Sequence, residues 1–350
     1  MFKKLLLNYY NKKPKSEIQD YIKFIYQATF GGAHIAKNKE LVKNYLYTEC
    51  SQMPKEVNFY EPLYEIISDD YVRVNLRPYI KANFSLDNLI EVFSSSEYLK
   101  GTDELEKNIN IFIEEVRNNN INLDINNVLE FIEKYRQEYY PVLHHTETYR
   151  NTYIPNYRVL PISFITDEMK YYQLKSFISY IKANNKKIFV AIEGKCTSGK
   201  TTLSNLLEND FDITLLHADD FFLNDKQKEK EIPIGEYIDQ DRIDKLLTDI
   251  KTNNTVTYQK YDCTNKCYID TIIRDVKDIV ILEGVYSYNS LLSKHFNYLV
   301  FIHVDKNIQN NRLLKRSSPF IYNKFITEWI PRENEYFDYF EILEKSDIII

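Results

Sequence analysis

The residues with the clearest chemistry in this sequence fit the pattern G-x-x-x-x-G-K-[ST]. They are Gly194, Lys195, Cys196, Thr197, Ser198, Gly199, Lys200 and Thr201. In this pattern the glycines let the backbone wrap around a phosphate, and successive N–H groups supply a positive potential. Lys200 is expected to bridge the β- and γ-phosphates of a nucleoside triphosphate, and the Thr201 hydroxyl is expected to bind Mg²⁺.

The flanking residues favour a phosphate-binding loop over a chance match. Residues 189–192 before the loop are an apolar run typical of a buried strand. Thr202 opens a helical segment, so the loop joins a strand to a helix as phosphate binding requires. Residues 194–202 are therefore predicted to bind the triphosphate, and ATP and Mg²⁺ are the expected cofactors.

Acidic residues follow two apolar runs further along the chain. Asp219 and Asp220 come after residues 213–217, and Glu283 closes residues 279–282. A carboxylate at the carboxyl edge of a neighbouring parallel strand faces the γ-phosphate, where a base must accept a proton from an attacking hydroxyl. Asp219 is predicted to be that base, and Glu283 to hold Mg²⁺, directly or through water, or to assist acceptor binding. The alternative is that these acids cap helices or lie in turns at strand ends.

Two aromatic residues, Phe221 and Phe222, stand next to the aspartates. Paired aromatics at this place are predicted to shield an acceptor pocket from water, because water is the competing acceptor and would turn transfer into hydrolysis. We therefore include Asp220, Phe221 and Phe222 among the predicted acceptor-binding residues.

The elements that must position these residues can be predicted from hydrophobic periodicity. Apolar residues recur at helical spacing in the first half of the chain, for example over residues 18–26 and 105–116. The periodicity fails over residues 141–161, which are predicted to be an ordered, polar and aromatic connecting segment, and a helix is expected over 167–186. Short apolar runs at 188–192, 213–217, 279–282 and 299–304 then alternate with helical segments, which is typical of a parallel α/β sheet.

The predicted fold class is therefore α/β. Residues 166–350 are expected to form a P-loop NTPase kinase domain with three layers and a mostly parallel sheet. A mainly α-helical N-terminal domain is expected over residues 1–165.

The C-terminal half also resembles a known family. Residues 194–202, 217–222, 279–284 and 311–316 are similar to the uridine kinase, nicotinamide riboside kinase and phosphoribulokinase group of P-loop kinases, and the resemblance covers about residues 186–350. It implies that Asp219 is the base and that Glu283 is the acid of the Glu-Gly element. It also implies that Arg312 and Arg316 belong to a lid that neutralises charge on the transferring phosphoryl group.

A closer likeness is to bacterial uridine-kinase-like proteins whose acceptors are mostly unassigned. The shared elements are residues 219–223, 238–242, 261–263, 283–287 and 329–333. In the aligned stretch, residues 231–239, the Asp with which true uridine kinases grip the ribose hydroxyls is missing at its place. Asp239 or Asp241 is the candidate to replace it, and Arg242 would suit an anionic acceptor better. Asp239, Arg242 and Tyr261 are therefore predicted to bind the acceptor.

The N-terminal half contains no motif that we can tie to a reaction. The cluster of His144, His145, Tyr149, Arg150, Tyr157 and Arg158, and the run Gly31, Gly32, Ala33 and His34, hold groups able to bind an anion or shuttle a proton. A structural role in fixing the connecting segment is the interpretation that we favour for this cluster.

Composition limits the partners and the compartment. The 350-residue chain has 45 Lys and Arg against 51 Asp and Glu, a formal net charge of −6, which argues against a surface built to hold nucleic acid. The four cysteines are too few and too scattered for a disulfide framework, which indicates reduced thiols. No apolar run reaches the length of a membrane span, so a cytoplasmic location is predicted. The expected partner is a small-molecule acceptor, with no nucleic acid and no membrane, and a homodimer stays open.

Together these observations predict an ATP-dependent phosphotransferase. It would move the γ-phosphoryl group to a hydroxyl of a nucleoside-, sugar- or vitamin-like molecule, with Lys200 and Arg316 handling charge. The alternative is a nucleotide-dependent ATPase switch or regulator that signals through the N-terminal helical domain.

Overall fold

A computed structural model describes residues 2–32, 38–54, 60–95, 101–223, 232–262, 265 and 267–350. Of the stretches discussed above, Ala33, His34 and residues 231 and 263 lie outside these ranges. The chain divides into two compact units, Met1–Gln173 and Leu174–Ile350. The division falls inside helix α9 (Asp167–Asn184), somewhat after the predicted boundary at residue 165.

The second unit is built on a five-stranded parallel sheet with the strand order β10-β9-β4-β8-β5. Its strands are β4 (Ile188–Gly194), β5 (Ile213–His217), β8 (Ile279–Glu283), β9 (Tyr298–Ile302) and β10 (Ile348–Ile349). Every residue of β4 and β8 is buried, which explains their continuous apolar runs, because a central parallel strand is covered on both faces. The predicted α/β class and the four predicted strands are confirmed.

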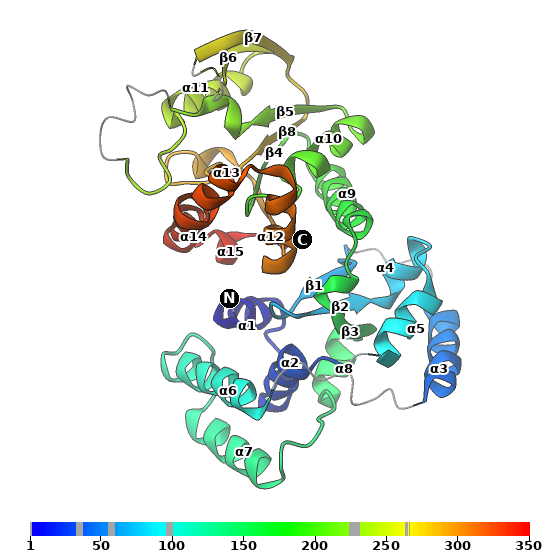
Figure 1. The fold of residues 1–350 in the computed structure, drawn as a ribbon. Coiled ribbons are helices and arrows are strands. Elements are labelled where there is room, and N and C mark those ends of the chain that lie inside the picture. Colours follow the sequence, from blue (N-terminus) through cyan, green and yellow to red (C-terminus); the bar gives the residue numbers. More distant parts are fainter. Residues whose placement is uncertain are drawn as a thin grey trace. The chain divides into compact units, whose positions relative to one another are not determined.

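Helices accompany these strands (Figure 1). They are α10 (Lys200–Asp210), α11 (Gln240–Ile250), α12 (Lys306–Arg316), α13 (Pro319–Lys324), α14 (Ile330–Tyr339) and α15 (Ile342–Lys345), with a π-helical turn at Phe325–Trp329 between α13 and α14. Helix α11 buries Ile243, Leu246, Leu247 and Ile250, which recur at helical spacing and join the core on the sheet.

An antiparallel hairpin of β6 (Thr255–Asp262) and β7 (Cys267–Asp275) was not predicted from the sequence. It lies beside α11, at one end of this unit (Figure 1). Most residues of β7 are exposed, so the strand lacks the apolar run that marks a buried one.

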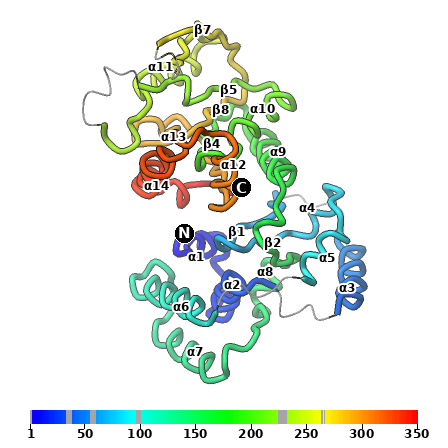
Figure 2. Tube along the Cα trace, viewed as in Figure 1, coloured from blue at the N-terminus to red at the C-terminus, as the bar shows by residue number. Residues whose placement is uncertain are grey.

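The first unit combines helices with a small antiparallel sheet of order β1-β2-β3. Its helices are α1 (Phe2–Lys12), α2 (Ile18–Phe30), α3 (Lys39–Gln52), α4 (Leu76–Lys81), α5 (Leu86–Ser95), α6 (Thr102–Arg117), α7 (Ile125–Gln137) and α8 (Glu147–Tyr153). Its strands are β1 (Tyr64–Ile66), β2 (Tyr71–Asn75) and β3 (Tyr157–Pro161). Helices α2 and α6 pack together, with α7 against α6 (Figure 2).

The segment 141–161 is more regular than its periodicity indicated. It contains α8, whose first turn is capped by the Thr146 side chain accepting from the Tyr149 N–H, and the strand β3. No helix in the described part of the chain is long and apolar enough to cross a membrane.

Candidate active site

The predicted phosphate-binding loop connects β4 to α10, as its flanking residues indicated. Gly194 ends β4 at φ +151°, and a Cβ built on it would lie 2.3 Å from the carbonyl oxygen of Ile302 on the neighbouring strand. Only glycine fits there. Thr197 and Gly199 adopt positive φ angles, and the loop turns sharply into α10, whose first amides are free of intrahelical partners. This geometry places backbone N–H groups and a helix N-terminus at one site.

Lys200 lies inside this loop with its ammonium group held by backbone carbonyls. Its Nζ donates to the carbonyl oxygen of Gly194 over 2.7 Å and to that of Lys195 over 3.1 Å. Lys200 is almost completely buried, whereas Lys195 is half-buried and Thr202 is exposed on α10. The ammonium therefore stays close to the amides that would bind a phosphate.

A buried hydroxyl in the loop tests whether a triphosphate suits this site. The Ser198 side chain is 1% exposed, and its Oγ has no hydrogen-bond partner among the described residues. A buried hydroxyl without a partner is costly, and a phosphate oxygen is an acceptor that would remove the cost. Together with the glycine-lined turn and Lys200, this fits a nucleoside triphosphate.

Three side chains meet where β5 and β8 end. Parallel pairing sets His217 opposite Glu283, and the His217 Nδ1 lies 2.6 Å from the Glu283 Oε1. The Thr201 hydroxyl donates to the same oxygen over 3.0 Å. The hydrogen bond to Glu283 raises the pKa of His217 above its ordinary value. A hydroxyl and a carboxylate at this distance are the hard oxygen ligands that Mg²⁺ prefers, so Thr201 and Glu283 fit the predicted metal role.

Asp219 lies in the short 3-10 helix Ala218–Phe221 that follows β5, and its side chain reaches solvent. Partial removal from water, followed by the negative charge of Glu283, raises the pKa of Asp219 above its ordinary value. The ends of β5 and β8 approach so closely that a Cβ on Gly284 would lie 2.6 Å from the Cβ of Ala218. Asp219, Glu283 and the loop lysine are thus held at one edge of the sheet.

Asp220 is buried and has partners of its own. The Tyr258 hydroxyl donates to its Oδ2 over 3.2 Å, and the Lys260 Nζ lies 3.0 Å from its Oδ1. Both partners belong to β6. The two adjacent aspartates therefore differ: Asp219 is accessible, while Asp220 ties the 3-10 helix to the hairpin.

The other predicted acceptor-binding residues frame this region. Phe221 is fully buried and stacks on Tyr258 with ring centroids 5.1 Å apart, so it lies in the core and not on an open surface. Phe222 is partly buried, and its backbone forms an isolated antiparallel β-bridge with Ile238.

Asp239, Arg242 and Tyr261 lie around helix α11 and the hairpin. The Asp239 side chain accepts from the Arg242 N–H over 3.2 Å and caps α11. The Arg242 guanidinium donates to the Gln259 carbonyl oxygen over 2.5 Å and lies over the Phe221 and Tyr268 rings. Tyr261 is buried against Tyr268. These contacts hold the hairpin on α11, and a contact of these residues with an acceptor stays a prediction.

The two predicted lid arginines lie on α12. The Arg312 Nη1 donates to the carbonyl oxygen of Thr197 over 3.0 Å, so this guanidinium rests on the phosphate-binding loop. Arg316 is exposed, with its guanidinium 5.4 Å from the Phe325 ring centroid. Of the two predicted lid arginines, Arg312 is the one that is hydrogen-bonded to the phosphate-binding loop.

Two buried acids beside the loop were missed from the sequence. The Glu333 Oε2 on α14 accepts from the Cys196 N–H over 2.9 Å, and burial raises the pKa of Glu333. Glu193, immediately before the loop, is fully buried, and its Oε1 lies 2.6 Å from the Tyr336 hydroxyl. An acid inside the apolar run of β4 was a signal that could have pointed to Glu193.

The proton count around Glu193 indicates a protonated carboxyl group. The Tyr336 hydroxyl has one hydrogen but two acceptors, the Glu193 Oε1 and the Tyr288 carbonyl oxygen at 2.7 Å. A Glu193 O–H that donates to Tyr336 resolves this count. Burial raises the pKa of Glu193 to about 8, which agrees with a neutral carboxyl group at neutral pH.

Comparisons with known proteins give structural likenesses only. No protein-family model matches the sequence, and no curated protein matches it. A possible uridine kinase from Bacillus stearothermophilus is similar in structure with a TM-score of 0.38 and 19% identity, over 51% of this chain and 98% of that one. Phosphoribulokinase from Rhodobacter spheroides gives a TM-score of 0.34 and 12% identity over 45% and 67% of the two chains. D-glycerate 3-kinase from Cryptococcus neoformans gives 0.34 and 15% over 45% and 83%.

Proposed function

We propose that this chain is an ATP-dependent kinase that phosphorylates a hydroxyl group of a small molecule. The observation that carries the proposal is the meeting of Lys200, Asp219 and Glu283 at the carboxyl edge of one parallel sheet, beside a loop shaped for phosphate. The location agrees with the rule that ligands of open α/β sheets bind outside the carboxyl ends of the strands.

The residues divide the work of transfer as follows. Loop amides and Lys200 hold the β- and γ-phosphates. Arg312, which already contacts the loop at Thr197, adds a positive charge that offsets the negative charge on the transferring phosphoryl group. A bond forms between the acceptor oxygen and the γ-phosphorus while the bond from that phosphorus to the β–γ bridging oxygen breaks. The acceptor proton passes to the Asp219 carboxylate.

The environment of Asp219 supports its role as the base. Its accessible side chain can meet an acceptor, whereas Asp220 is committed to Tyr258 and Lys260. A raised pKa makes Asp219 a stronger base than an ordinary carboxylate near neutral pH. Mg²⁺ held by Thr201 and Glu283 would neutralise phosphate charge when bound.

The acceptor class is proposed from the family resemblance and the predicted acceptor-binding residues. Nucleoside-, sugar- and vitamin-like alcohols are the candidates, and Arg242 favours those that carry an anionic group. Asp239 and Tyr261 are the further proposed contacts.

The decisive experiment is an acceptor screen with the purified full chain, ATP and magnesium. Nucleosides, sugars, polyol acids and vitamins are incubated separately, and the mass gain of one phosphoryl group on the acceptor is read by mass spectrometry. We expect one class to gain the phosphoryl group, and we expect Lys200→Ala to lose both ATP binding and transfer.

Lys186→Ala is the matched control, because Lys186 is exposed in the same unit and should leave both unchanged. If Lys200→Ala binds and turns over ATP like the parent, the site is misassigned. Release of free phosphate with no acceptor modified would instead favour the ATPase switch.

A further inference from the structure

A pocket lies entirely within the first unit, and none of its lining residues belongs to the candidate active site. Its volume is about 540 Å³, within the range of small-molecule sites. Its walls come from α2, α3, α5, α8 and β3, and from the segment that leads into α8. This segment and β3 carry the histidine, tyrosine and arginine cluster that the sequence pointed to.

The lining is rich in positive charge. Among the described lining residues, Lys23, Arg150 and Arg158 stand against one carboxylate, Glu49, which is already ion-paired with Arg158. The Lys23 Nζ donates to the Leu143 carbonyl oxygen over 2.7 Å. Burial and then the charge of Arg73 lower the pKa of Lys23 to about 8, so this ammonium would be stabilised by an anion.

A fully buried arginine strengthens the positive potential. Arg73 on β2 is 1% exposed, and its Nε and Nη2 donate to the Gln27 Oε1 over 3.1 and 2.7 Å. Its guanidinium packs on the rings of Tyr9, Phe24 and Tyr157, and no carboxylate of the described ranges lies within ion-pair distance of it. This buried cation is hydrogen-bonded to a neutral group and adds positive charge next to Gln27 and Tyr157, which both line the pocket, and Glu65 opposite it on β1 offsets part of that charge.

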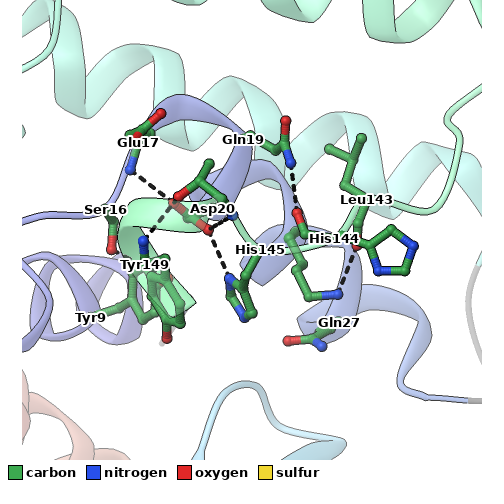
Figure 3. Close-up of polar contacts among 12 residues, drawn as sticks. Tyr9, Ser16, Glu17, Gln19, Asp20, Gln27, Leu143, His144, His145 and Tyr149 are labelled. Carbon is green, nitrogen blue, oxygen red and sulfur yellow. Dashed lines mark hydrogen bonds and ion pairs between the residues drawn. The ribbon is translucent and has the colours of Figure 1, made fainter. Parts of the chain in front are cut away.

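The polar floor of the pocket is fixed by a chain of hydrogen bonds (Figure 3). The His145 Nδ1 lies 2.8 Å from the Asp20 Oδ1 and its Nε2 lies 2.6 Å from the Tyr157 hydroxyl. Because Asp20 can only accept, Nδ1 carries a proton, and in the neutral ring Nε2 takes the Tyr157 hydrogen over the shorter of two contacts, since that hydroxyl also lies 3.3 Å from the Gln27 Oε1. Burial lowers the pKa of His145 to about 4, so the ring is neutral and adds no charge.

Asp20 keeps its negative charge, which acts on Lys23, but the carboxylate itself does not line the pocket and is bonded to His145, Thr146 and Glu17. Besides His145, it accepts from the Glu17 N–H over 3.0 Å and from the Thr146 N–H and hydroxyl over 3.0 and 2.7 Å. Its side chain is completely buried. These bonds position the pocket residues before any ligand arrives.

The remaining walls are apolar. Leu41, Val42 and Leu46 come from α3, Phe93 from α5 and Val159 from β3. A site with cations on some walls and aliphatic or aromatic side chains on others suits a ligand with both characters.

We propose that this pocket binds a small organic anion, with a phosphate or carboxylate group held by Lys23, Arg150 and Arg158 and an apolar body against α3 and α5. The site is separate from the P-loop and does not rest on the proposed kinase activity. Arg150 and His144 are exposed at the pocket, so a ligand can reach them.

The test is isothermal titration of the full chain with three probes. Phenyl phosphate and benzoate carry the two anionic groups, and benzyl alcohol is their neutral counterpart. At least one anion should bind saturably with one site per chain, about tenfold or more tighter than benzyl alcohol. The stronger of the two anions identifies the head group.

Variants separate the pocket from other sites. Arg150→Gln should weaken the anion about tenfold, whereas Arg117→Gln, a matched exposed arginine on α6 outside the pocket, should not. Lys23→Met should weaken it similarly. In Lys200→Ala the anion should bind as in the parent, since the P-loop is not its site.

Four results would overturn the proposal. They are no saturable binding of either anion, benzyl alcohol binding as tightly as the anions, an equal loss in Arg117→Gln, or loss of binding in Lys200→Ala. Arg150 is exposed, so its variant is expected to melt at the parent's temperature, which keeps a binding loss interpretable.

Discussion

The buried carboxyl group of Glu193 should make the stability of the second unit depend on pH in a specific direction. Its Oε2 has no hydrogen-bond partner among the described residues, and its pKa is raised to about 8 by burial. The native state therefore holds a proton that the unfolded chain releases above about pH 4.5. The stability linked to this group is full below the unfolded pKa and is lost as the pH rises towards about 8.

Glu193→Gln removes this titration while keeping a neutral side chain of the same shape. Between about pH 5.5 and about pH 7.5 the native state binds about one proton more than the unfolded state. The free energy of unfolding of the parent should then fall, relative to the variant, by about 1.4 kcal/mol per pH unit, or about 2.7 kcal/mol over this interval. Groups such as His217 and Glu333 also titrate, but they are common to both proteins and cancel in the difference.

The assay is urea unfolding followed by the fluorescence of Trp329, the single tryptophan, which lies in the second unit. Glu335→Gln is the matched control, because Glu335 is exposed on the same helix as Tyr336 and should keep the pH dependence of the parent. If the difference between the parent and Glu193→Gln is the same at all pH values, Glu193 is ionised in the folded protein and the proton count at Tyr336 is wrong.

Three further outcomes follow from the site. Asp219→Asn should bind ATP normally but lower turnover by about 10²–10⁴-fold, the usual contribution of a positioned base, in a phosphoryl-transfer assay, and a near-normal rate would remove Asp219 from the mechanism. Glu283→Gln should raise the magnesium concentration for half-maximal turnover by about tenfold or more in a metal titration, and an unchanged midpoint would contradict its metal role. Gly194→Ala, whose Cβ would lie 2.3 Å from the Ile302 oxygen, should destabilise the second unit by about 1–3 kcal/mol in urea, and parental stability would show that the loop can relax.

The parts of the site that could be predicted depend on signals local in sequence. The phosphate-binding loop is one continuous motif, and β4 and β8 are apolar throughout because both of their faces are covered. Since both β5 and β8 end in polar residues, the same logic could have paired His217 with Glu283, which the parallel register places opposite each other.

The parts that could not be predicted have weak or non-local signals. Strand β1 is only three residues long, and β3 lies where helical periodicity fails, so the small sheet of the first unit has no pattern of its own. The ion pair of Asp220 with Lys260 depends on the hairpin of β6 and β7 folding back on the 3-10 helix. Without that hairpin, Asp219 and Asp220 are equivalent in the sequence.

In helix α14, periodicity predicts which side chains are buried but not what they contact. Glu333, Tyr336 and Phe337 are spaced by three and four residues and share one buried face, so the pattern places a carboxylate among aromatic side chains. A carboxylate on such a face must accept hydrogen bonds from buried donors or become protonated, so its position indicates a specific buried partner. The partners, Cys196 for Glu333 and Glu193 for Tyr336, are more than a hundred residues away in the chain, and only the packed fold brings them together. The buried face of α14 therefore contacts the phosphate-binding loop at Cys196 and the residue just before it, Glu193. Spacing along α14 indicates that these side chains are buried, but it does not identify their partners.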